Sequence, residues 1–157
     1  MRFSYKKALV TLTDYAYSQG YEKVVLNHKG VSFMNWRTKT LNEPISIYIE
    51  GKYSLEEKTY IFLHELGHHS LRKDWEKFTQ RLPVVAYAEH VNLVYNDKRF
   101  KRRDSYIVSS LEEEFMAWDE GLKIALRLGI RVNVSRWIDL KSKCLKSYIT
   151  YYATLKK

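Results

Sequence analysis

The stretch SLEEKTYIFLHELGHHSL, residues 54–71, decides the fold because it combines a helix start with an unusual group of histidines. Ser54 followed three residues later by Glu57 forms a capping box, in which each residue bonds the other's backbone N–H group. This box predicts that a helix begins near Leu55 and runs to about Leu71. The segment holds three of the five histidines in the chain.

His64 and His68 lie four residues apart, so a helix presents both imidazoles on one face. Glu65 lies about 100° around the helix from His64, which is poor for a third metal ligand but suits contact with a metal-bound water. This HExxH pattern is typical of zinc peptidases, with two histidine ligands and a glutamate as general base. The alternative is an ordinary core helix whose two histidines are partly buried and hydrogen-bonded locally.

A catalytic zinc site needs a third protein ligand. Asp74 lies ten residues after His64, where metzincins have their third ligand, but Leu71 occupies the position at which that family needs glycine. His90 is a second candidate, although no motif surrounds it. The third and favoured source is SSLEEEFMAWDEGLKIA, residues 109–125, which contains three consecutive glutamates.

Glu114 is the favoured ligand among these glutamates, ahead of Glu113. Ser110 and Glu113 form a second capping box, which predicts a helix from there to about residue 128 and assigns Glu113 to the cap. Glu114 instead shares a helix face with three small residues that allow a second helix to approach closely: Ala117, Gly121 and Ala125. The alternative for all three glutamates, Glu112 included, is that they complement the positive helix N-terminus.

The remaining sequence predicts an α+β fold in a single domain, residues 1–157. An N-terminal helix covers residues 4–18, and three short strands follow at residues 23–27, 31–36 and 45–50, with HKG at 28–30 as a hairpin turn. Pro83 can begin a helix that ends near residue 95. A last helix is expected from Ser135 to about residue 155.

The sequence also bears on the cellular location of the protein. We expect no membrane span, because the sequence has no run of about 18 apolar residues. The N-terminus lacks the apolar region of a secretory signal, and the single cysteine, Cys144, rules out an internal disulfide. These features favour a cytoplasmic protein.

The charge suits an acidic partner. The formal net charge is +9, from 27 lysines and arginines against 18 aspartates and glutamates. Five of the six residues in KRFKRR, residues 98–103, are cationic. This run is either a solvated loop or a contact for nucleic acid.

The motifs together resemble a minimal gluzincin of the ImmA/IrrE type. The resemblance rests on ISIYIE at residues 45–50, the HELGH motif at residues 64–68, and Glu114-Phe115-Met116-Ala117 as an E-x-x-A element. It implies a zincin-like fold, with His64, His68 and Glu114 as zinc ligands and Glu65 as general base. It also implies proteolysis of an intracellular regulatory protein.

Two other functions stay open from the sequence. The first is a non-catalytic protein that keeps the metal helix as a structural element. The second is a basic nucleic-acid-associated protein in which the charge is the function. For the enzyme, a tyrosine or histidine that stabilises the oxyanion is also expected, and Tyr87, His90, Tyr95 and Tyr106 are the candidates.

Overall fold

The structure is a computed structural model, and it describes residues 3–35, 45–97 and 99–154. These residues form six α-helices and a three-stranded sheet, which confirms the predicted α+β class. The elements in chain order are α1 (Tyr5–Ser18), β1 (Lys23–His28), β2 (Phe33–Asn35), β3 (Ser46–Glu50), α2 (Leu55–Arg72), α3 (Trp75–Arg81), α4 (Pro83–Tyr95), the short 3₁₀ helix η1 (Arg99–Arg102), α5 (Asp104–Arg127) and α6 (Val134–Thr154).

The sheet order is β1-β3-β2, with β1 parallel and β2 antiparallel to β3. The predicted hairpin between the first two strands is therefore wrong. β3 is the central strand, and its side chains Ile47 and Ile49 are fully buried. The central position suits this strand because neighbours on both sides shield its apolar side chains from water. The chain still bends at Gly30, whose φ of +125° is accessible to glycine. One predicted strand position, Trp36, lies outside the described residues.

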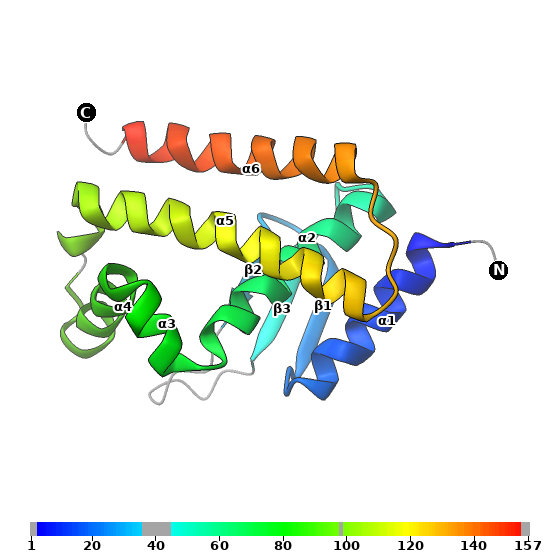
Figure 1. Cartoon of the computed structure of the whole chain (residues 1–157), viewed down its shortest axis with the longest axis horizontal. Coiled ribbons are helices and arrows are strands. Elements are labelled where there is room, and N and C mark those ends of the chain that lie inside the picture. The colour runs from blue at the N-terminus through cyan, green and yellow to red at the C-terminus, as the bar shows by residue number, and fades with distance from the viewer. Residues whose placement is uncertain (1–2, 36–44, 98, 155–157) are drawn as a thin grey trace.

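The central helix is α2, and it begins as predicted. Ser54 Oγ accepts from the Glu57 N–H group, while the Glu57 carboxylate accepts from the Ser54 N–H group, so the capping box is complete. Every residue from Lys58 to His68 is buried. In Figure 1, α2 lies between the sheet and α5, and α6 runs beside α5. The histidines therefore enter the interior, where polar groups need partners.

The helices α2 and α5 pack with their backbones almost in contact. A methyl group placed on Gly67 would lie 1.9 Å from the Ala117 carbonyl oxygen, and one on Gly121 would lie 2.6 Å from the Leu63 carbonyl oxygen. Both positions therefore require glycine. This confirms the prediction that the small residues beside Glu114 allow close approach of a second helix.

The second predicted capping box is wrong. Helix α5 begins earlier, at Asp104, which places an acid in the first turn and Ser110 inside the helix. Ser110 instead hydrogen-bonds Tyr152 of α6, at 2.9 Å. Glu113 therefore does not cap α5, and its carboxylate instead bonds to side chains of α2.

The other helix boundaries agree closely with the sequence. Helix α4 begins at Pro83 as predicted, and α6 spans Val134–Thr154, while residue 155 lies outside the described part. Residues 75–81, which the sequence left unassigned, form α3, capped by Asp74. Within the described residues, no helix has the length and apolarity needed to cross a bilayer.

Candidate metal centre

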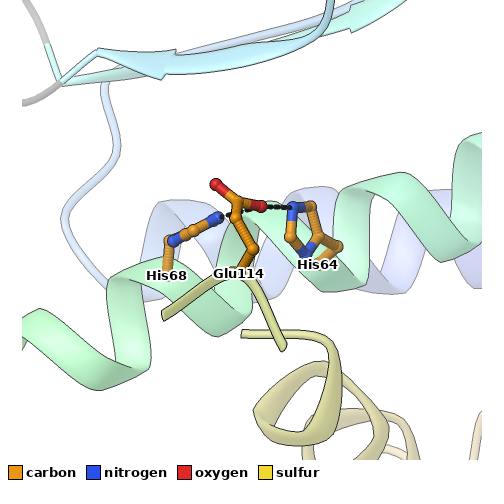
Figure 2. A group of neighbouring side chains, drawn as sticks. All are labelled: His64, His68 and Glu114. Carbon is orange, nitrogen blue, oxygen red and sulfur yellow. Dashed lines mark ion pairs between the residues drawn. The ribbon is translucent and has the colours of Figure 1, made fainter. Parts of the chain in front are cut away.

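His64 and His68 of α2 and Glu114 of α5 form one group that can hold a metal ion (Figure 2). Their ligand atoms all lie within 4.8 Å of one another. Glu114 Oε2 lies 3.2 Å from His64 Nε2 and 3.4 Å from His68 Nε2, between the two rings. The three residues that the sequence selected thus meet in space, although Glu114 comes from a distant part of the chain.

The spacing of these atoms suits tetrahedral coordination. With metal–ligand bonds of about 2.0–2.1 Å, a tetrahedral zinc site separates neighbouring ligand atoms by about 3.3–3.4 Å. The two nitrogen–oxygen distances, 3.2 and 3.4 Å, are close to this value. Glu114 Oε2 is also a buried atom with no hydrogen-bond partner among the described residues. A cation between the three residues would satisfy it.

Glu113 holds the second histidine. Its Oε1 lies 2.8 Å from His68 Nδ1 and also accepts from Arg72, which bonds Glu89 of α4 at 2.7 Å. Burial opposes the charge on Glu113, but His68 and Arg72 outweigh it and lower the pKa of Glu113. Because an ionised carboxylate only accepts, Nδ1 must donate, and the neutral ring then offers its Nε2 lone pair to a metal.

His64 is fixed by packing instead. Its ring stacks on Trp118 of α5, with centroids 4.5 Å apart and an interplanar angle of 21°. The indole is fully buried, so the imidazole has little room to rotate. Trp118 therefore lies directly beside a candidate metal ligand, whereas its neighbour Asp119 pairs with Lys141 at 2.8 Å.

The two carboxylates favour positive charge between the helices. Burial alone would lower the pKa of His68, but Glu114 and Glu113 overcome it and raise this pKa to about 10. Burial would raise the pKa of Glu114, yet the two histidines lower it overall. A buried pocket that stabilises an added positive charge in this way also suits a metal cation.

Glu65 lies in the same pocket but outside the ligand group. It is buried, and burial raises the pKa of Glu65 although His64 and His68 act against that change. A carboxyl with a raised pKa accepts and releases protons closer to neutral pH than an exposed one does. Glu65 therefore borders the group of His64, His68 and Glu114 without being a member of it.

A cleft passes over Glu65. It consists of two hollows of about 250 and 370 Å³ that share Ser32, Glu65 and Tyr148. The smaller hollow lies on the His68 side and is mainly polar, with Arg72 and Tyr106. The larger lies on the His64 side and has apolar walls that include Val31, Tyr53, Ile61 and Tyr151. An extended ligand lying over Glu65 would therefore contact polar side chains on one side of this residue and apolar side chains on the other.

Tyr148 of α6 was missed by sequence reasoning. It lines both hollows, and burial followed by the charges of Glu114 and Glu65 raises the pKa of Tyr148, so its hydroxyl stays protonated. Among the tyrosines expected there, only Tyr106 lines the cleft, and Tyr87 and Tyr95 border another hollow. Tyr148 belongs to the apolar stripe of the last helix, where its spacing indicates only packing.

The rejected ligand candidates lie elsewhere. Asp74 caps α3 by accepting from the Lys77 N–H group at 3.1 Å. His90 is exposed on α4, and Glu112 is exposed on α5. Among the described residues, none of the three joins the group of His64, His68 and Glu114.

A scan of protein-family models, a search of curated proteins and a search of solved structures each returned no match. The function must therefore be inferred from the chemistry of the site itself.

Proposed function

We propose that the chain is a zinc-dependent metallopeptidase with a zincin-like pairing of α2 and α5. The observation that carries this proposal is the division of labour in one buried pocket. His64, His68 and Glu114 converge on a common point, while Glu65 lies beside them without joining the group. A purely structural metal site has no need of an additional buried carboxyl group.

Zinc suits the ligands better than the hard cations do. Two imidazole nitrogens and one carboxylate oxygen form the ligand set of a catalytic zinc site, which keeps a fourth position open. Magnesium and calcium prefer sets made of oxygen alone. When bound, zinc supplies a Lewis acid that polarises a carbonyl oxygen and lowers the pKa of water.

The residues of the chain then divide the remaining work. Glu65 takes a proton from the attacking water and later passes it to the leaving amine, as a general base and then a general acid. Tyr148 lines both hollows together with Glu65, and its hydroxyl can donate to the carbonyl oxygen as negative charge develops there. Trp118 keeps the far side of His64 dry.

The cleft favours a peptide as substrate. Its hollows extend in two directions from Glu65, so an extended chain can place its scissile bond at the centre and its flanking residues on either side. The apolar walls on the His64 side suit an apolar or aromatic residue. The resemblance to ImmA/IrrE-type peptidases supports a regulatory protein inside the cell as the substrate.

Two substitutions test the proposed roles. Glu65→Gln removes the base and keeps the ligands, so it should lower the rate about 10²–10⁴-fold while zinc stays bound. Glu114→Gln should lower zinc affinity first, since a neutral amide is a weak ligand. Zinc occupancy is measured beside cleavage of unfolded casein or self-cleavage. Full activity in Glu65→Gln would exclude this mechanism.

A further inference from the structure

A second surface of the molecule is hollow, aromatic and cationic. The outer side of α4 and the turn η1 enclose an open hollow of about 800 Å³. Its walls include three aromatic rings and two arginines: Tyr87, Tyr95, Phe100, Arg99 and Arg102. We call this region the α4–η1 surface, and none of these residues lines the cleft at Glu65.

A smaller hollow of about 270 Å³ adjoins it and shares Tyr87 and Phe100. These two rings meet edge to face, with centroids 5.1 Å apart, and form the wall between the hollows. Arg103 lies on the second side, with its guanidinium carbon 4.2 Å from the centroid of Phe100. Each hollow thus has an aromatic wall and at least one arginine.

The aromatic rings are not part of a core. Tyr87 is 55% exposed and Tyr95 is 72% exposed, although both lie on a helix whose inner side packs against the rest of the protein. Apolar surface gathered in a hollow is commonly a site of binding. The flat faces of tyrosine rings suit flat partners.

Two of the three arginines beside these rings are available for a ligand. Arg99 is held by Asp97, with Nη2 and Oδ2 2.8 Å apart. Arg102 and Arg103 are exposed and lie on opposite sides of the aromatic wall. Their charges contribute to a net charge of +9, so an anionic partner would be attracted over a distance.

We propose that the α4–η1 surface binds single-stranded nucleic acid, with bases against Tyr87 and Phe100 and phosphates against Arg102 and Arg103. Unpaired bases expose the faces that stack on aromatic side chains, and the backbone follows the cations. A duplex hides those faces, and an acidic peptide would use the arginines but leave the rings without a flat partner. This inference does not depend on the metal centre.

The test measures fluorescence anisotropy of labelled oligo(dT) and oligo(U), each about 12 nucleotides long, against a duplex of equal length and a poly-glutamate peptide. Arg102→Gln/Arg103→Gln should weaken single-strand binding at least tenfold and lower the salt slope by roughly 0.7 for each lost phosphate contact. Arg127→Gln/Arg131→Gln, at the last residue of α5 and in the connection to α6, removes the same charge and should change binding much less.

The ring is tested separately. Tyr87→Ala should weaken binding about tenfold, whereas Tyr87→Phe keeps the stacking face and should bind like the unmodified chain. Circular dichroism checks that each variant folds. Duplex or poly-glutamate bound as tightly as the single strands would overturn the proposal. So would absence of single-strand binding at low salt, or equal loss in both double-arginine variants.

Discussion

We compare the pocket between α2 and α5, which holds His64, His68 and Glu114, with the α4–η1 surface. Both contain charged and aromatic side chains, but the pocket buries its charged groups and the surface exposes them. In the pocket, His64, His68 and Glu114 are largely buried, and Glu113 and Arg72 support them from behind. On the surface, Arg102 and Arg103 face solvent.

This difference in burial decides which charged groups need a nearby partner for the fold to be stable. A buried charge loses its hydration and survives only with close partners, whereas an exposed arginine costs little. The pocket gathers carboxyl groups against His68 and Arg72, and a metal cation between His64, His68 and Glu114 could take the place of the histidine proton. The surface needs no partner for stability, so its role must be tested by binding.

Removal of the Tyr148 hydroxyl should have the largest effect in the pocket after loss of the base. Tyr148→Phe keeps the ring that lines both hollows and should lower kcat about 10²–10³-fold, with zinc content unchanged. Tyr87→Phe, on the α4–η1 surface, is the matched control and should leave kcat unchanged. An equal effect of the two would remove the distinction between the regions.

Gly67→Ala should test the close helix packing. The added methyl group would lie 1.9 Å from the Ala117 carbonyl oxygen, so the helices must separate. Overpacking of this severity should lower the free energy of unfolding by about 3 kcal/mol, measured in urea. Arg102→Gln should change it by less than about 0.5 kcal/mol. A smaller loss in Gly67→Ala than in Arg102→Gln would contradict the described packing.

Glu113→Gln should separate support of a ligand from ligation. The amide can accept only a weaker bond from His68, so zinc affinity should fall about 10–100-fold, measured by competition with a chelator. The adjacent Glu112→Gln removes the same charge from an exposed position and should leave affinity unchanged. Equal affinities in the two variants would show that His68 needs no support.

The sequence predicted the parts of the molecule that depend on local chemistry. The capping box at Ser54 placed the start of α2, and helical spacing brought His64 and His68 to one face. The small residues beside Glu114 predicted a close neighbour, and α2 is that neighbour. The identity of the neighbour came from the HExxH pattern, which requires a third ligand.

The parts that failed depend on tertiary context. The turn at Gly30 was compatible with a hairpin, and only the burial of β3 between the other strands excludes it. Glu113 matched a capping pattern by chance, since α5 begins a full turn or more before Ser110. Tyr148 reaches the cleft because α6 packs along α5. The spacing of apolar residues along α6 cannot reveal which helix it packs against.

The central claim is that His64, His68 and Glu114 bind one zinc ion, and metal content tests it most directly. The protein is purified without chelator, and zinc per chain is measured by elemental analysis for the unmodified chain, His64→Ala and the exposed-histidine control His90→Ala. We predict about one zinc per chain in the unmodified protein and in His90→Ala, and almost none in folded His64→Ala. Absence of zinc from the unmodified protein, with no uptake of added zinc, would contradict the account, as would full zinc content in His64→Ala.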